Sequence, residues 1–502
     1  MDVAPRTPSH PAGELAVATH TNRAHLSRQA KIGAAYRVGP GLYVVGATLP
    51  RRDAVRHHRF AVISHVWPGA VLGDRTALAG GNPVEGWMFA THPAPTRRAP
   101  LHLDGLSIAV RLGPGPLPGD LPMPNDLHLS GEARKLVENV PGPGKPATGR
   151  PPRQAGTTAV EDAIDELARL GGAGRVASVL AELDIISGSL PPGPIEFVRS
   201  RLVAVLGTRS AGVPASGRLA ARLAGEPFDE HRLTMLRELI TVLQVTAPEP
   251  RPALGPAERW EWEPFFEAYF SNYIEGTHFP VEVARRIAIE GEVPPGRPAD
   301  AHDVAATFRL VSDPASSSTS ANSADEFVDL LRDQHATLMA ARPDKRPGMF
   351  KTTPNYAGGY TFVAPELVSG TLRHGFDLLA AISDPLHRAV ALMLLVTECH
   401  PFDDGNGRMA RIVANAALSR AGQVRIVIPT VYRNNYLAGL AGVSNGNGRG
   451  ESLISVLSFA QRWTAAVDWS DYHRADEILE SVNSYLDAGL ADRAGVRLRL
   501  PS

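Results

Sequence analysis

One run of twelve residues constrains this chain more than any other. Residues 400–411 read His-Pro-Phe-Asp-Asp-Gly-Asn-Gly-Arg-Met-Ala-Arg and follow an apolar stretch, residues 389–396, that is preceded by Asp384-Pro385. A proline in this place is typical of a helix start, and residues 409–418 are again helical in composition. The run therefore predicts two helices joined by a glycine-rich turn that lies at the N-terminus of the second helix.

The residue types of this turn suit a polyphosphate. Gly405, Asn406 and Gly407 bring free backbone N–H groups to a helix start, which favours an anion, and glycines let a ligand approach the backbone closely. Arg408 and Arg411 lie three residues apart on one helix face, and each carries a forked set of donors for phosphate oxygens. These five residues are the predicted phosphate-binding group.

Two side chains flank the turn and add chemistry to it. Asp404 offers a hard oxygen ligand for Mg²⁺, which usually binds one or two carboxylates together with substrate phosphates. His400, at the end of the first helix, can accept a proton near neutral pH. The simpler alternative is a surface turn beside a packed histidine. Cys399 fits a small buried hydrophobic residue better than a nucleophile.

Residues 400–411 resemble the signature of the Fic family, whose members move part of a nucleotide onto a protein hydroxyl. The resemblance implies that ATP is the co-substrate, that Mg²⁺ is held by Asp404 and that His400 is the catalytic base. It also implies a target protein whose Ser, Thr or Tyr hydroxyl receives AMP. The resemblance covers about residues 258–470, less than half of the chain.

A second motif lies upstream, where residues 271–276 read Ser-Asn-Tyr-Ile-Glu-Gly. Ser271 and Glu275 are four residues apart and share a helix face. The motif resembles the inhibitory helix of Fic proteins, which implies that Glu275 pairs with Arg411 and blocks the productive pose of the γ-phosphate. Taken alone, a glutamate before a helix-ending glycine such as Gly276 is commonplace.

Two more features of the same region resemble the family. Residues 347–351 and 358–362 look like its β-hairpin flap, which implies that Gly358, Gly359, Tyr360 and Thr361 lie over the site and pair with the target as an added strand. Lysine at position 351 departs from the usual arginine. Tyr436 falls where the family often places an aromatic residue near the adenine; ordinary core packing is the alternative.

The composition limits the other classes of function. The formal net charge of the 502 residues is −1, so no overall field favours nucleic acid or acidic membranes. A single cysteine fits a reducing cytoplasm, and the apolar runs are too short to span a bilayer. We therefore expect a cytoplasmic protein without a membrane partner, and association into homo-oligomers stays open.

The first sixty residues are locally basic, with nine Lys or Arg against three Asp or Glu. Residues 22–33 can form a helix, and residues 35–45 read as two short strands around a Gly-Pro-Gly turn. This outline resembles the winged helix of AbiEi-type antitoxin-like transcriptional regulators, which implies DNA as a partner. A protein-docking domain of the same fold, or a structural domain with a solvated basic face, is the alternative.

We expect a mainly α protein, with a Fic-like helical core and β-hairpin flap preceded by an α/β winged-helix-like domain. The expected domains are residues 1–60, 61–246, 258–470 and a helical cap over 471–502, with a proline-rich linker at 247–257. The expected activity is protein adenylylation under inhibition by Glu275. The alternatives are a DNA-binding regulator with a sensing Fic domain, or a Fic enzyme that uses another nucleotide or removes AMP.

Overall fold

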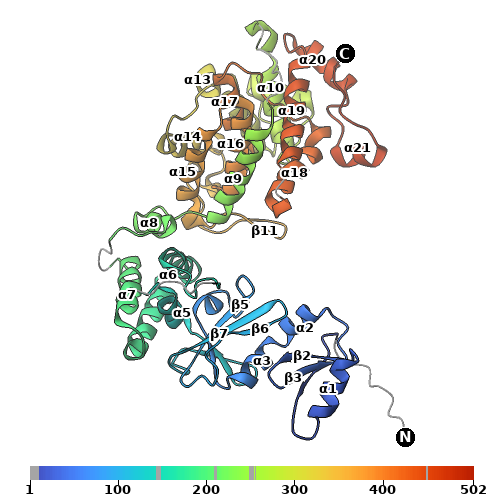
Figure 1. Ribbon diagram of the computed structural model, residues 1–502. Helices are drawn as coiled ribbons and strands as arrows, with labels where there is room; N and C mark the ends of the chain where they lie inside the picture. The colour runs from blue at the N-terminus through green and yellow to red at the C-terminus, as the bar shows by residue number, and fades with distance from the viewer. Residues whose placement is uncertain are drawn as a thin grey trace. The chain divides into compact units, whose positions relative to one another are not determined.

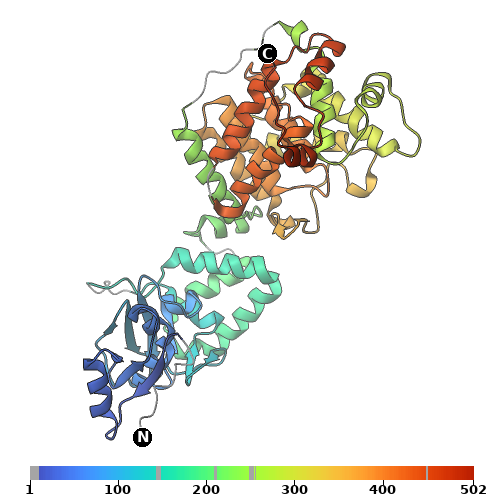
Figure 2. The same cartoon turned by 90° about the vertical axis from the view of Figure 1, so that its right-hand side faces the viewer.

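The chain is mainly helical and forms two compact units. The computed structural model describes residues 11–142, 149–207, 212–247, 254, 256–447 and 450–501. The units are Met1–Gly225 and Glu226–Ser502, drawn in blue to green and in green to red (Figures 1 and 2). Within the described residues, no helix combines the length and apolar character needed to cross a bilayer.

The first unit begins with a small antiparallel sheet and one helix, which match the expected helix and hairpin. The sheet has the order β1-β3-β2, and the turn between β2 and β3 includes Gly41, whose φ of +69° favours glycine. Exposed Arg23, Arg28 and Lys31 lie on α1, whose buried residue is Leu26. The elements are β1 (Glu14–Val17), α1 (Arg23–Lys31), β2 (Ala35–Gly39) and β3 (Leu42–Val45).

A six-stranded mixed sheet follows, with the order β6-β7-β5-β4-β9-β8. One hydrophobic core runs from Val38 of the small sheet to Leu127 of the large one, so the packing is continuous across the expected boundary at residue 60. The elements are α2 (Arg51–His57), α3 (Arg59–Val66), β4 (Val71–Leu72), α4 (Asp74–Leu78), β5 (Trp87–His92), β6 (Leu101–Leu103), β7 (Leu106–Leu112), β8 (Leu121–Met123) and β9 (Leu127–Leu129).

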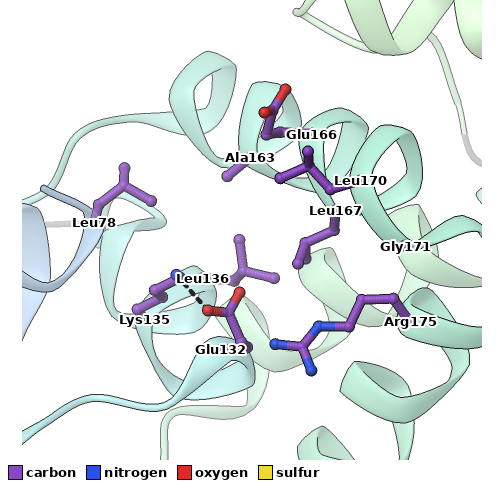
Figure 3. Close-up of a pocket in the computed structure, with 10 residues that line it drawn as sticks. All are labelled: Leu78, Glu132, Lys135, Leu136, Ala163, Glu166, Leu167, Leu170, Gly171 and Arg175. Atoms are coloured by element: carbon purple, nitrogen blue, oxygen red, sulfur yellow. Dashed lines mark hydrogen bonds and ion pairs between the residues drawn. The ribbon is translucent and has the colours of Figure 1, made fainter. Parts of the chain in front are cut away.

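Helices complete the first unit around a second hydrophobic core. Helix α6 kinks at Gly172, where φ is +59°, within the run Gly171-Gly172-Ala173-Gly174. A cavity of about 390 Å³ lies between α4, α5 and α6, with leucines and charged side chains on its wall (Figure 3). The elements are α5 (Glu132–Asn139), α6 (Thr157–Ile186), η1 (Ser187–Ser189), α7 (Pro192–Val205) and α8 (Gly217–Leu223).

The second unit is a helical bundle built around α16, most of whose residues are buried. A two-stranded hairpin, β10–β11, is the sheet of this unit among the residues the structure describes. The elements up to the hairpin are α9 (Glu230–Val245), η2 (Ala257–Trp260), α10 (Glu263–Ile274), α11 (Val281–Arg285), η3 (Arg286–Glu290), α12 (Pro298–Ser312), α13 (Pro314–Ser317), α14 (Ala324–Leu338), η4 (Pro343–Lys345), β10 (Tyr356–Ala357) and β11 (Tyr360–Thr361). The remaining elements are η5 (Pro365–Leu367), α15 (Val368–Leu378), η6 (Leu379–Ala381), α16 (Pro385–Cys399), α17 (Asn406–Arg420), η7 (Thr430–Tyr432), α18 (Arg433–Gly442), η8 (Val443–Asn447), α19 (Glu451–Ala466), α20 (Tyr472–Ser481) and α21 (Ala488–Ala494).

Helix α9 belongs to this second unit, which differs from the expected division at residues 247–257. Leu236, Leu239 and Leu243 are buried in the same core as α16, because apolar residues recur along one face of α9. Most of the proline-rich segment, residues 248–253 and 255, lies outside the described residues. The boundary between the two compact units lies between Gly225 and Glu226, before α9 rather than after it.

The expected C-terminal cap packs against the aromatic side of α10. Phe266 stacks on Tyr472 of α20 with ring centroids 5.8 Å apart, and Phe270 stacks on Tyr485 at 5.6 Å. Trp469 is fully buried in the same cluster. Helix α10, which carries the Ser271–Gly276 motif, is therefore an integral part of the core.

Candidate active site

His400 ends α16 and closes one side of the site. Its φ of +46° is left-handed, and its N–H donates to the Val396 carbonyl at 3.0 Å. The ring Nδ1 lies 3.2 Å from the Thr397 carbonyl, an acceptor, so Nδ1 carries the hydrogen and Nε2 is left as the basic nitrogen. The ring stacks on Phe362 at 3.8 Å. Burial lowers the pKa of His400 to about 4, so the ring is neutral at pH 7.

The predicted glycine-rich turn between two helices is present. Gly405 has a φ of +76° and is the N-cap of α17, and the Asp404 carboxylate accepts its N–H at 2.7 Å. The Asn406 side chain makes two bonds to the backbone of Phe402, accepting from its N–H and donating to its carbonyl, both at 2.9 Å. Asn406 was expected to bind phosphate, and here its amide shapes the turn.

Arg411 joins the turn to α10. Its Nε donates to the Ser271 hydroxyl at 3.0 Å, and its Nη2 donates to the Ser271 carbonyl at 2.9 Å and to Glu275 Oε1 at 2.7 Å. The Glu275 carboxylate also lies so close to Gly407 that a Cβ there would collide with it. The structure thus brings together Ser271, Glu275, Gly407 and Arg411, and the contact between Glu275 and Arg411 is the pairing that the resemblance implies.

Arg408 has a different environment from Arg411. Its Nη1 lies 3.0 Å from the Asp303 carboxylate and donates to the Asn272 side chain at 3.3 Å. Asp303 also pairs with Arg342, and both Arg408 and Asp303 are almost fully buried. Arg408 was expected to bind phosphate; in this structure it ties α17 to α10 and α12 inside the protein.

Tyr436 lies on α18, beneath the same arginine that holds Glu275. It is 1% exposed, and the Arg411 guanidinium lies 5.9 Å from the centre of its ring. Its burial is that of core packing, and a contact of Tyr436 with the adenine stays a prediction.

Three side chains outside residues 400–411 support the motif loop, and of these the sequence singled out only Lys351. His335 on α14 stacks on Phe402 at 3.7 Å, accepts from the Gly348 N–H and contacts the Asp404 carbonyl at 3.1 Å. Lys351 donates to the Cys399 carbonyl at 3.2 Å and to Asn355 at 2.6 Å. Asn355 in turn donates to the Phe402 carbonyl at 2.9 Å. No local pattern marks His335 or Asn355, because the Asp404 and Phe402 carbonyls that they contact lie far along the chain.

The predicted flap is a short hairpin. Tyr356 pairs with Thr361 and Ala357 with Tyr360, and Gly358, with a φ of +58°, and Gly359 form the two-residue turn. Side chains alternate across such a hairpin, so Tyr360 faces the protein while Tyr356, 64% exposed, faces outward.

The acidic residues of the turn can support one metal ion only with help from a substrate. Among the described residues, no group of three or more His, Cys, Asp or Glu side chains gathers as a metal site would. Asp403 is already bound to Arg346 by two contacts of 2.8 Å. Asp404 has one oxygen bonded to a backbone N–H, which leaves its carboxylate suited to Mg²⁺ that arrives with phosphates.

Residues 326–418, which run from α14 to α17 and include the hairpin and the turn, match the Fic/DOC family. The chain carries a Fic/DOC domain. The match leaves out Ser271, Glu275 and Tyr436, which lie outside its limits.

Curated relatives of this Fic/DOC domain are named protein adenylyltransferases. The chain is 30% identical to protein adenylyltransferase fic-1 of Caenorhabditis briggsae over 184 residues, 35% of this chain and 36% of that protein. It is 26% identical to protein adenylyltransferase Fic of Nematostella vectensis over 197 residues, 38% of this chain and 46% of that protein. The chain therefore spans less than half the length of these relatives. A solved structure of Fic-1 from C. elegans aligns at a TM-score of 0.36 and 17% identity, covering 65% of this chain and 89% of that one.

Proposed function

We propose that the Fic/DOC domain transfers AMP from ATP to a Ser, Thr or Tyr hydroxyl of a target protein. The observation that carries the proposal is the arrangement of a neutral histidine, a glycine-rich helix start and Arg411 around one turn. The names of the distant relatives support the same reaction class. The β- and γ-phosphates bind the turn at Gly405 and Gly407 and the donors of Arg411.

The chemistry follows from the state of His400. Its Nε2 lone pair takes the proton of the target hydroxyl as the oxygen attacks the α-phosphorus, and the bond from that phosphorus to the bridging oxygen breaks. Pyrophosphate leaves, and AMP stays on the target oxygen. Mg²⁺ held by Asp404 would neutralise phosphate charge. Positioning and charge neutralisation supply most of the rate in such transfers.

We infer that the enzyme is inhibited by Glu275 in the conformation described. The carboxylate occupies a donor of Arg411 and adds negative charge where a γ-phosphate would bind. Because the Glu275 side chain is 31% exposed, it can leave while the rest of α10 stays packed.

The test is self-modification and target modification with ATP labelled on the α-phosphate, using the full-length Glu275→Gly protein and Mg²⁺. Label on protein, lost in the Glu275→Gly, His400→Ala double variant, is the expected result. Faster labelling from another nucleoside triphosphate would identify that nucleotide as the co-substrate. Release of AMP from pre-modified protein would show that the enzyme removes AMP. Mass spectrometry of proteins from cells that express Glu275→Gly identifies the target.

A second function, DNA binding, is proposed for the first unit. Basic side chains are exposed on α1, and a cleft of about 510 Å³ beside the β2–β3 hairpin is lined in part by Arg37, Arg51, Arg97 and His102. Binding to duplex fragments should weaken steeply as salt rises. Affinity that does not change between about 50 and 200 mM salt would contradict it.

A further inference from the structure

The carboxylate of Glu398, two residues before His400, is buried and has three polar partners. Glu398, on the last turn of α16, is 3% exposed. It accepts hydrogen bonds from the Tyr360 hydroxyl of the flap and from the Ser444 hydroxyl of η8. Its third partner is Arg232, whose Nε lies 3.5 Å from the carboxylate. A buried charge needs such partners, so we expect Glu398 and the side chains around it to keep their positions.

Arg232 makes three contacts, two to the flap and one to the Glu398 carboxylate that also holds the flap. It lies on α9 and is 8% exposed. Its Nη2 donates to the Thr361 carbonyl, its guanidinium lies 4.7 Å from the centre of the Tyr360 ring, and its charge faces Glu398. A planar guanidinium can make a backbone bond, a ring contact and an ion pair together, whereas an ammonium cannot.

The contacts continue from the flap to the catalytic histidine. Phe362 follows Thr361 directly, and its ring lies flat on the His400 ring, with an interplanar angle of 13°. The Phe362 N–H donates to the Asn355 carbonyl at 3.3 Å, which closes the base of the hairpin. Movement of Thr361 would therefore be passed through one peptide unit to the ring that stacks on His400.

We propose that Arg232 is a positioning residue that fixes the flap and, through Phe362, the ring of His400. The inference rests on the proposed transfer reaction, in which the flap presents the target and His400 takes the proton. Arg232 lies outside residues 326–418 and close behind the start of the second unit at Glu226. The geometry of the Fic/DOC domain thus depends on a helix that precedes it in the chain.

The same contacts decide which face of the hairpin meets a target. With Tyr360 held inward by Arg232 and Glu398, the outward face carries Tyr356 and Thr361. If the anchor is lost, both faces become available and the strand register of a bound target is no longer fixed.

Hydrogen exchange of the full-length protein tests the anchor without any need for activity. Arg232→Gln should speed amide exchange in residues 355–362 by about tenfold or more, because Gln cannot make the three contacts together. Arg237→Gln is the matched control, since Arg237 lies on the same helix but is 45% exposed and pairs with Glu230 at the surface. It should leave exchange in the flap unchanged. Unchanged exchange in Arg232→Gln overturns the proposal.

Kinetics in the Glu275→Gly background supply the second readout. Arg232→Gln should lower transfer to protein hydroxyls by about 10- to 100-fold while ATP affinity changes less than about twofold, since small misplacements affect the chemical step. Equal losses in transfer and ATP affinity would indicate a merely structural role. If Glu275→Gly transfers no nucleotide, the proposed function fails, and the exchange experiment still decides the role of Arg232. Should Arg232→Gln unfold the domain, Tyr360→Phe, which removes only the bond to Glu398, must also speed exchange in the flap.

Discussion

The Arg411 guanidinium and the Glu275 carboxylate lie 2.7 Å apart although 136 residues separate them in sequence. The same guanidinium holds the hydroxyl and carbonyl of Ser271, one turn earlier on α10. The opposite side of α10 packs in the aromatic cluster with Tyr472 and Tyr485. A ligand can therefore displace one carboxylate far more easily than the whole helix.

Replacing Glu275 by glycine should activate transfer strongly. The change frees one donor of Arg411 and removes a negative charge from the place of the γ-phosphate. Restoring an in-line pose is worth about 10²-fold or more in rate. The measurement is incorporation of α-labelled AMP by wild type and Glu275→Gly under the same ATP and Mg²⁺ concentrations.

Glu282→Gly is a suitable control for that experiment, because Glu282 lies in the first turn of the next helix, α11, and pairs with Tyr472 and Arg285 instead. It should not activate transfer. A folded Glu275→Gly protein that is no faster than wild type would mean that Glu275 is not the inhibitor.

His400→Ala should abolish transfer and leave ATP binding largely intact. Nε2 of His400 is the base in the proposed reaction, whereas the phosphate contacts come from the turn and Arg411. Loss of a general base lowers the rate by about 10²- to 10⁴-fold. Calorimetry measures ATP binding and labelled AMP measures transfer, both in the Glu275→Gly background. If the Glu275→Gly, His400→Ala protein transfers AMP nearly as fast as Glu275→Gly alone, His400 is not the catalytic base.

The parts of the site that the sequence predicted are those that short motifs specify. The turn at Gly405 follows from helix-end chemistry, and the pairing of Glu275 with Arg411 is what the resemblance of residues 271–276 to an inhibitory helix implies. The roles of Arg408 and Asn406 could not be predicted in the same way. The partners of Arg408, Asp303 and Asn272, lie on two other helices, and no spacing rule connects them to the motif.

The packing partner of α9 could not be predicted from the local sequence either. The proline-rich segment at residues 247–257 is a strong local signal for a chain break, and it favoured a boundary after α9. The apolar face of α9 predicts only that the helix packs against something. That its partner is the core around α16 is settled by tertiary packing.

Two truncated proteins test whether α9 is part of the folded core of the second unit or lies outside it. A chain that begins at Glu226 keeps α9 and should fold, whereas one that begins at Glu258 loses the buried side chains of Leu236, Leu239 and Leu243. Exposing the core beneath three leucines lowers the free energy of unfolding by several kcal/mol, since each Leu→Ala change in a core lowers it by about 2 to 5 kcal/mol. Thermal melting followed by circular dichroism measures the difference. Equal melting temperatures would place α9 outside the folded core.

Acid should destabilise the second unit before most carboxylates titrate, because burial lowers the pKa values of His335 and His400 to about 4. An unfolded histidine has a pKa near 6.5. Above pH 6.5 both states are neutral at these rings, so the native state keeps its full stability. As the pH falls from 6.5 towards 4, the unfolded state binds protons that the native state does not, and the free energy of unfolding drops by up to about 3 kcal/mol for each ring.

His335→Gln should flatten this dependence. The variant loses the contacts of the ring with Phe402 and Gly348, so it should be less stable than wild type at pH 7.5. Because Gln does not titrate, the difference should narrow as the pH falls through 6 towards 4.5. His473→Gln, at an exposed position on α20, is the control and should follow the wild-type curve. Calorimetric melting of the full-length proteins between pH 4.5 and 7.5 measures all three curves. Parallel curves for wild type and His335→Gln would show that His335 takes up its proton equally in the folded and unfolded states, against the burial that the structure gives it.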